Sequence, residues 1–341
     1  MVETRAHRVQ LKEIAEALNI SPATVSLVLH NKPGVSEETR AMVREALIDS
    51  GYGEAALAAA TNSIHLLKYN VFGYDTGYSV MMINDIYDAI VMEGRKMGWS
   101  ISATTCHEGE FKKFLELTKA NPMDGMIIMG TALPMGYEEY LDLYKKPLVL
   151  VDTYEPSIND TCVVVNNRQC LYLAIEALYK QGHRSIGLIY NCFQTYNYLD
   201  RYEGFMRGMR DFGLKAEERF IFPVNPMMDD AYDNIVAIME MKGDIPTAMI
   251  ADNTTIAVGM LGALRNRGYD IPKDVSLIAI GDTRFCRMTT PKLSVINVSA
   301  EEMGKAAIRK LNSIINQRDE AGGLICINGK YVQRESVASP K

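Results

Sequence analysis

Hydroxyl and other small side chains are spaced along residues 21–30 so that they fall on one side of a short predicted helix. The outward positions are Ala23, Thr24, Ser26, Leu27 and His30. Side chains of this size let a helix approach base edges in a DNA major groove, which is about 12 Å wide. The chemistry open to this stretch is therefore hydrogen bonding to nucleic acid rather than bond breaking.

Three short amphipathic helices are predicted to hold that face. The first ends near Asn19, which tolerates a left-handed backbone, and Ser21 is a good N-cap for the second, with Pro22 at its first position. Ser36 caps the third helix. The short turn after Asn19 makes the first two helices cross steeply, as in a helix-turn-helix. The expected core positions are Leu11, Ile14, Ala15, Leu18, Val25, Val28, Leu29, Val43, Ala46 and Leu47.

The net charge of residues 1–60 does not favour strong sequence-independent binding to DNA. Residues 1–60 hold six Lys or Arg and eight Asp or Glu, a net charge of −2. Because phosphate neutralisation supplies non-specific affinity, we expect weak binding to random DNA and a modest salt dependence. A three-helix cap on an enzyme is the alternative interpretation of the same periodicity.

The whole chain has 341 residues, which fits a small headpiece and a core of two lobes. Its composition is that of a globular protein, and its net charge of −6 means that any DNA contact must be local. The six cysteines form no close pair, so we expect no disulfide framework, metal or cofactor. With no signal sequence and no apolar run of 18 residues, we expect a cytoplasmic protein without a membrane partner.

From Leu66 onward, strand-like runs alternate with amphipathic helices, which is typical of parallel sheets covered by helices. Strands are expected at 69–74, 99–104, 125–129, 147–151, 161–165, 186–190, 219–222, 248–251, 275–280 and 293–297. Helices are expected at 81–97, 110–120, 136–144, 168–181, 200–212, 229–241, 254–267 and 300–316. The repeated rhythm predicts two doubly wound α/β lobes with a ligand site between them, outside the carboxyl ends of the strands.

Specific motifs accompany this pattern. The first part of the chain has Ala23-Thr24-Val25-Ser26, Val35-Ser36-Glu37-Glu38-Thr39-Arg40 and Gly51-Tyr52; the body has Met123-Asp124-Gly125-Met126-Ile127, Pro147-Leu148-Val149-Leu150-Val151-Asp152, Asn166-Asn167-Arg168, Gly182-His183-Arg184-Ser185-Ile186, Arg201-Tyr202-Glu203-Gly204-Phe205 and Thr290-Pro291-Lys292-Leu293-Ser294. In order and spacing, nearly the whole chain resembles the LacI/GalR family of transcriptional regulators. The resemblance implies an all-α helix-turn-helix headpiece (1–52), a linker or hinge (53–65) and a periplasmic-binding-protein-like body for effector binding and dimerisation (66–341).

The resemblance also implies site residues. The DNA-binding set is Leu11, Lys12, Ser21, Pro22, Ala23, Thr24, Ser26, His30, Ser36 and Thr39; the effector-binding set is Tyr74, Asp75, Tyr78, Arg201, Asn253 and Asp282. A guanidinium such as that of Arg201 suits hydroxyl pairs or carboxylates. The motif around Arg201 favours a place in the pocket, and a surface helix arginine is the alternative. Asn253 matches a pocket asparagine, or it caps the helix that follows.

The chain departs from the family pattern at several positions. Gly281 stands where an aspartate commonly binds sugar hydroxyls, so Asp282 is left to bind ligand or to serve the hinge. Pro22 and Leu27 replace residues that often contact bases, which leaves shape and small polar groups for discrimination. In the linker, Leu57 is the only candidate for a minor-groove wedge.

These features predict a repressor of carbohydrate genes, which binds a near-palindromic DNA operator as a homodimer, with further pairing to a tetramer left open. The effector is expected to be a carbohydrate, with a nucleoside or another small metabolite as the alternative. An enzyme is not expected, because no activated nucleophile or catalytic carboxylate pair has a usable spacing. A transport solute-binding protein would lack the headpiece, and a sensor that has lost operator binding is the remaining alternative.

Overall fold

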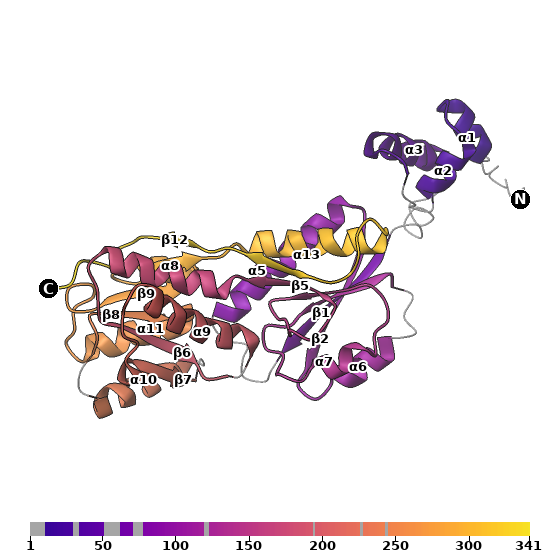
Figure 1. Cartoon of the computed structure of the whole chain (residues 1–341). Helices are drawn as coiled ribbons and strands as arrows, with labels where there is room; N and C mark the ends of the chain where they lie inside the picture. The colour runs from indigo at the N-terminus through magenta and orange to yellow at the C-terminus, as the bar shows by residue number, and fades with distance from the viewer. Residues whose placement is uncertain are drawn as a thin grey trace, which may run out of the picture.

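The computed structural model describes residues 11–29, 34–50, 62–70, 78–118, 123–193, 195–225, 228–242 and 245–341. It contains a small helical headpiece followed by a body of two α/β lobes (Figure 1). His30, Tyr74, Asp75 and the linker with Leu57 lie outside the described residues. Among the helices that are described, none combines the length and the apolar character needed to span a membrane.

The headpiece consists of α1 (Leu11–Ala17), α2 (Pro22–Leu29) and α3 (Glu37–Asp49). Its core is formed by Ile14, Ala15, Val25, Val28, Val43 and Leu47, all buried, as the helical spacing predicts. Asn19 adopts a left-handed backbone with φ of 53°, which ends the first helix. The predicted helix-turn-helix is therefore confirmed, including its stop signal.

The first lobe is built on a parallel sheet in the order β11-β5-β4-β3-β1-β2. Its strands are β1 (Ser63–Asn70), β2 (Ser100–His107), β3 (Gly125–Met129), β4 (Leu148–Val151), β5 (Thr161–Val165) and β11 (Leu324–Ile327). Helices α5 (Tyr78–Lys96) and α13 (Ala300–Ile315) cover one face, and α6 (Phe111–Thr118) and α7 (Glu138–Leu141) cover the other. Both faces of the inner strands β3, β4 and β5 are therefore buried, which explains their continuous apolar runs.

The second lobe repeats this plan with the sheet order β12-β10-β9-β8-β6-β7. Its strands are β6 (Ile186–Asn191), β7 (Ile221–Val224), β8 (Ala248–Ala251), β9 (Ser276–Ile280), β10 (Ser294–Asn297) and β12 (Lys330–Val332), and only β12 pairs antiparallel. Helices α8 (Asn167–Lys180) and α9 (Tyr196–Asp211) lie on one face, and α10 (Met228–Lys242) and α11 (Thr254–Asn266) on the other. The short η1 (Glu218–Phe220) and α12 (Arg284–Met288) complete it.

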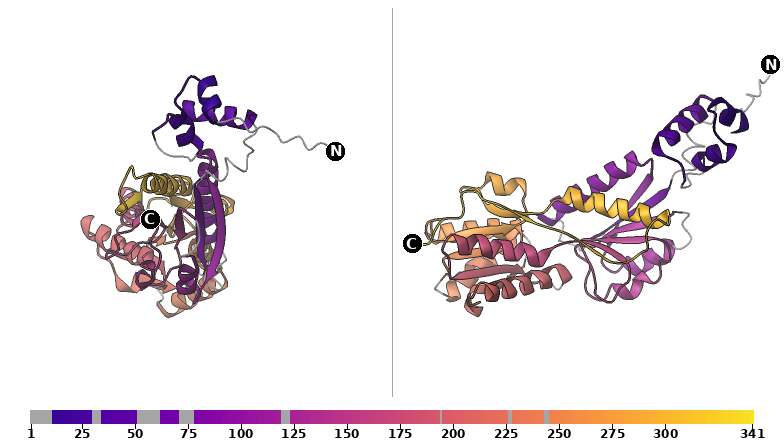
Figure 2. Two further views of the ribbon diagram at one scale, coloured as in Figure 1. Left: turned by 90° about the vertical axis from the view of Figure 1, so that its right-hand side faces the viewer. Right: turned by 45° about the horizontal axis from the view of Figure 1, so that its top comes forward.

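The lobes are not two successive halves of the sequence. The helix expected at 300–316, placed in the second repeat by its position in the chain, is α13, which packs against α5 in the first lobe (Figure 2). The chain then adds β11 to the first sheet and β12 to the second, so it passes between the lobes three times. These two strands were not predicted, because they are short and only half-buried.

Several element boundaries also differ from the prediction, most of all those of the first strand and of α9. The first strand was expected at 69–74 but runs from Ser63 to Asn70, because the run after Ser63 is buried between β2 and β3 in spite of its polar His65 and Lys68. The helix expected at 200–212 begins four residues earlier, at Tyr196. This earlier start places Tyr196 and Asn197 on the first turn of α9, next to the other lobe.

Candidate functional site

Helix α2 of the headpiece is fixed at its start by a hydroxyl cap. Ser21 Oγ accepts a hydrogen bond from the backbone N–H of Thr24 at 3.0 Å, and the two hydroxyls lie 2.8 Å apart. Ser36 and Thr39 repeat this arrangement at the start of α3, with an N–H···O distance of 3.2 Å and a hydroxyl distance of 2.8 Å. Both predicted caps are confirmed, and each satisfies a backbone donor that the helix leaves unpaired.

The predicted DNA-binding residues lie mainly on the outside of the headpiece. Lys12, Ser21, Pro22, Ala23 and Ser36 are exposed. Leu11, Thr24, Ser26 and Thr39 are half-buried. Their apolar neighbours Val25 and Val28 are buried in the core, so α2 separates a packed face from a polar one. The described surface of α2 is thus narrow and uncharged, and its only hydroxyls are those of Thr24 and Ser26.

A second group of polar residues gathers where the strands of the two lobes end. Thr131 follows β3, and Asp152 follows β4, in the first lobe; Asp252 and Asn253 follow β8 in the second. Asp152 has a left-handed backbone with φ of 57°, which is uncommon for a residue with a side chain. Such strain is often retained at functional sites, where the surrounding structure enforces it.

Helix α9 supplies the groups that meet these strand ends. Arg201 is only 6% exposed and donates from Nε to Asn167 Oδ1 at 2.8 Å and from Nη1 to the carbonyl of Asp252 at 2.6 Å. Asn167 Nδ2 donates to Asn197 Oδ1 at 2.9 Å, and Asn197 Nδ2 lies 2.6 Å from the carbonyl of Asp152. The burial of Arg201 excludes the alternative that it is a surface arginine, and its role in effector binding remains a prediction.

The carboxyl groups of the two aspartates at this site are buried. Burial raises the pKa of Asp152, while the hydroxyl of Thr131, the charge of Arg201 and the amide of Asn197 act in the opposite direction. Burial likewise raises the pKa of Asp252 to about 6, with Arg201 and the backbone N–H of Asn191 opposing the rise. A carboxyl group that titrates this close to neutrality can either accept or donate a hydrogen bond to a ligand.

The remaining predicted effector residues have structural contacts. Asn253 is the N-cap of α11, since its Oδ1 accepts from the N–H of Ile256 at 2.9 Å. Asp282 Oδ2 accepts from Arg334 at 2.6 Å, which links the end of β9 to the segment after β12, and from Arg287 of α12 at 3.1 Å. Tyr78 is the first residue of α5, but its side chain is not described. Ligand roles for these residues remain predictions.

Sequence reasoning missed Asp152, Asn197 and Asp252 as members of the site. Two of them carried a signal, because Asp152 and Asp252 each come directly after a buried apolar strand, where ligands of α/β sheets bind. No sequence signal pointed to Asn197, because the predicted helix began at residue 200 and did not include it. Within the described part of the chain, no three His, Cys, Asp or Glu side chains group together as a metal site would require.

The raised pKa of Asp252 predicts a pH dependence of stability. The unfolded Asp keeps a pKa near 3.8, so the folded protein binds this proton more tightly. The protonated Asp252 contributes fully to stability below pH ~4, and this contribution is lost as the pH rises to ~6. For a pKa shift of about two units, the free energy of unfolding falls by about 3 kcal/mol over this range. Urea unfolding of the wild type and of Asp252→Asn, at pH 4 to 7, measures this as a falling difference between the two free energies of unfolding.

Asp152 is present in both proteins of that comparison, so its own titration cancels in the difference. Parallel pH profiles of the two proteins would contradict the assignment of a raised pKa to Asp252.

Comparison with known proteins finds one family model that matches the headpiece and another that matches much of the body. Residues 10–53 match the family model described as bacterial regulatory proteins, lacI family, and residues 175–337 match that of a periplasmic binding protein-like domain. The chain is 26% identical over 336 residues to the NTD biosynthesis operon regulator NtdR of Bacillus subtilis (strain 168), covering 96% of this chain and 99% of that protein. It is 27% identical over 337 residues to the HTH-type transcriptional repressor PurR of Klebsiella pneumoniae (strain 342), covering 96% of each.

Solved structures share the whole fold. A lac repressor dimer bound to operator and the anti-inducer ONPF has a TM-score of 0.73 at 19% identity, covering 97% of this chain and 100% of that one. The transcriptional regulator CelR in complex with cellobiose has a TM-score of 0.70 at 19% identity, covering 96% and 100%. Residues 10–53 thus match the lacI family of bacterial regulatory proteins, residues 175–337 match a periplasmic binding protein-like domain, and over nearly its whole length the chain is similar to the two transcriptional regulators named above.

Proposed function

We propose that this protein is a transcriptional repressor that binds a near-palindromic operator as a homodimer and responds to a small ligand held between its lobes. The observation that carries this proposal is the joining of two sites in one chain. A capped helix with a narrow polar face is attached to a body whose buried polar groups lie between two lobes. In the proposed organisation, residues 1–52 bind DNA, 53–65 form the hinge, and 66–341 bind the effector and the second subunit.

On the DNA side, the proposal assigns α2 to the major groove. Ala23 and Pro22 are small and exposed, so the backbone of α2 can approach base edges closely. Lys12 carries the positive charge of the predicted set and is exposed, with Glu16 4.0 Å away as an ion-pair partner. Relatives named as HTH-type transcriptional repressors, and a lac repressor structure with bound operator, support this assignment.

On the effector side, the proposal favours a hydroxyl-rich ligand of the carbohydrate class. Asp152 and Asp252 contribute two buried carboxyl groups, which accept hydrogen bonds from hydroxyls, whereas Arg201 contributes one cation. An anionic ligand would add charge to a site that already holds more acid than base. The structure of CelR with cellobiose supports a carbohydrate, and a nucleoside or another small metabolite is the alternative outcome.

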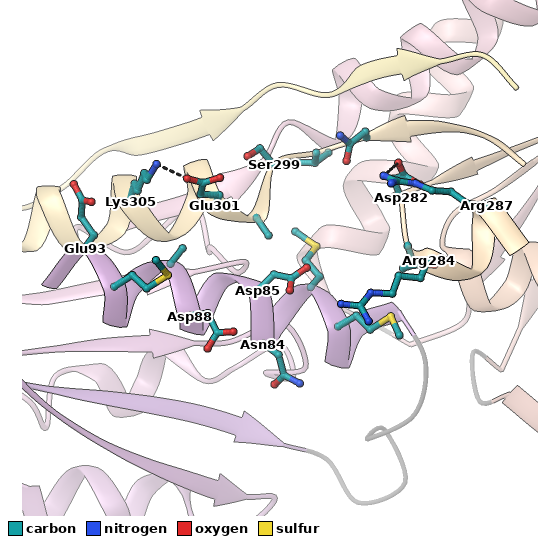
Figure 3. Close-up of a pocket in the computed structure, with 18 of the residues that line it drawn as sticks. Asn84, Asp85, Asp88, Glu93, Asp282, Arg284, Arg287, Ser299, Glu301 and Lys305 are labelled. Atoms are coloured by element: carbon teal, nitrogen blue, oxygen red, sulfur yellow. Dashed lines mark hydrogen bonds and ion pairs between the residues drawn. The ribbon is translucent and has the colours of Figure 1, made fainter. Parts of the chain in front are cut away.

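The surface proposed for the second subunit lies along α5 and α12. A groove of about 830 Å³ runs between α5 and the segment from α12 to α13, with Asp85 and Asp88 on one side and Arg284 and Arg287 on the other (Figure 3). Exposed apolar side chains flank it, with Met92 62% and Met288 77% exposed. Apolar patches next to charges of both signs are typical of protein interfaces, and this one includes both lobes.

The DNA-binding part of the proposal is tested with sites selected from fragmented genomic DNA. We expect the full-length protein to enrich a near-palindromic site, and Thr24→Ala or Ser26→Ala to weaken its binding by about 1–3 kcal/mol if these hydroxyls contact bases or phosphates. Fluorescence anisotropy against salt measures the affinity, and Thr24→Ser is the control that keeps the hydroxyl. The absence of enrichment over random DNA would overturn operator binding, and unchanged affinity of both Ala variants would remove the two side chains from the interface.

The proposed dimer surface is tested by placing a charge on it. Met288→Glu should weaken the dimer at least about tenfold, because the new carboxylate would be desolvated in the interface. Sedimentation equilibrium measures the dimer dissociation constant. Leu117→Glu is the matched control, since Leu117 is 70% exposed on α6, on the other face of the first lobe. Equal dimer affinity in both variants and the wild type would contradict this surface.

A further inference from the structure

The carboxylate of Asp152 is already satisfied by groups of the protein. Thr131 Oγ1, from the same lobe, donates to its Oδ2 at 2.7 Å. Asn197, from the other lobe, lies with Nδ2 3.2 Å from Oδ1 and 2.6 Å from the backbone carbonyl of Asp152. A buried carboxylate is costly unless it is hydrogen-bonded, so the amide of Asn197 replaces the water that this group would otherwise hold.

The amide of Asn197 is itself held in position. Arg201 Nε donates to Asn167 Oδ1, and Asn167 Nδ2 donates to Asn197 Oδ1. The chain of donors therefore begins at the guanidinium and ends at the carboxylate, so that each bond polarises the next. Asn167 and Asn197 are both buried, which protects these bonds from exchange with water.

Further contacts of α9 with the first lobe surround this bond. Tyr154 OH donates to Asp200 Oδ2 at 2.7 Å, and the rings of Tyr154 and Tyr196 lie 5.5 Å apart. Tyr196 also packs against the apolar cluster of the first lobe. Tyr196, Asn197 and Asp200 are spaced along one side of the first turns of α9, so they meet the segment after β4 together.

We propose that Asn197 is a specificity-determining residue that occupies the place of the effector's own hydrogen-bond donor on Asp152. With this amide in place, the lobes are held together without a ligand. An effector gains access to Asp152 only by displacing Asn197, so it must present a hydroxyl or amine donor there rather than a carboxylate or phosphate. This inference rests on the proposed effector site and adds a competitor to it.

The backbone of Asp152 agrees with this role. Its left-handed conformation is unfavourable for a residue with a Cβ, and it is held by the contacts of the side chain with Thr131 and Asn197. When Asn197 leaves, one of these restraints is lost. The segment after β4 could then shift as the lobes open and the effector site becomes accessible.

The experiment compares the ligand-free, full-length wild type with Asn197→Ala by small-angle X-ray scattering. Arg207→Ala is the matched control, because Arg207 is exposed on the same helix and pairs with Asp211 of its own lobe. We expect a larger radius of gyration for Asn197→Ala alone, as the lobes open. Scattering identical to that of the wild type and of Arg207→Ala would overturn the proposal.

A second variant of Asn197 distinguishes the opening of the lobes from a loss of folding. Asn197→Asp keeps the volume of the side chain but sets a carboxyl group against that of Asp152, so it should open the lobes at neutral pH and close them again in acid. Circular dichroism confirms that each variant is folded before scattering. An Asn197→Asp protein that stays closed at neutral pH would count against the proposal as directly as a closed Asn197→Ala protein.

Ligand affinity distinguishes the two possible roles of Asn197, because removing a competitor tightens binding, whereas removing a ligand contact weakens it. The probes are D-glucose, D-glucosamine, D-gluconate and inosine, measured by calorimetry. If Asn197 is a competitor, its removal tightens binding of the compound that the wild type accepts by about 3- to 10-fold, since the competent state is more populated. Weaker binding would mean that Asn197 is a ligand contact and would overturn the inference. If the wild type binds none of the four probes, the proposed effector class fails, while the scattering still decides the role of Asn197.

Discussion

The constraint on which the body depends is the burial of Asp152 between the two lobes. A carboxylate out of water is stable only with hydrogen-bond donors around it, and here one donor comes from each lobe. Closing the lobes therefore satisfies a charge, and opening them exposes it to water or to a ligand. Removing either donor while the site stays closed would leave a buried carboxyl group with fewer hydrogen bonds, which is costly.

The topology turns this local bond into a movement of the whole body. The chain passes between the lobes three times, and α13 and β11 return to the first lobe after most of the second is built. In the proposed response to an effector, these three connections would act as a hinge about which the lobes rotate. Because the groove along α5 and α12 has walls from both lobes, rotation would change the surface proposed for the second subunit. Two headpieces carried by such a dimer would then change their spacing, which is how a small ligand can alter DNA affinity.

Much of this organisation could be predicted from the sequence, for physical reasons that differ between elements. Buried strands such as 125–129 and 248–251 lie where their continuous apolar runs indicated, because both faces of the sheets are covered. The caps Ser21 and Ser36 were predictable because a hydroxyl at a helix start accepts a hydrogen bond from a backbone N–H only three residues away. β11 and β12 were not, because short half-buried strands depend on partners far away in the sequence.

The candidate site was only partly predictable for the same reason. Arg201 was found through its motif, but its partners Asn167 and Asn197 are defined by a hydrogen-bond chain that no periodicity records. Asn253 could equally have been a pocket residue or a cap, and only the fold shows that it caps α11. The sequence left Asp282 as either a ligand-binding residue or a hinge residue, and in the structure it forms an ion pair with Arg334.

We propose that the interlobe site and the headpiece are thermodynamically linked, so that each ligand changes the affinity for the other by the same factor. With the operator and effector in hand, the operator dissociation constant would be determined with and without saturating effector, and the effector dissociation constant with and without saturating operator, for the wild type and Arg201→Ala. The account predicts that the two ratios are equal and differ from one, typically by about 5- to 150-fold, and that Arg201→Ala abolishes the coupling while it keeps operator affinity. Effector binding that is the same for free and operator-bound protein would contradict the account.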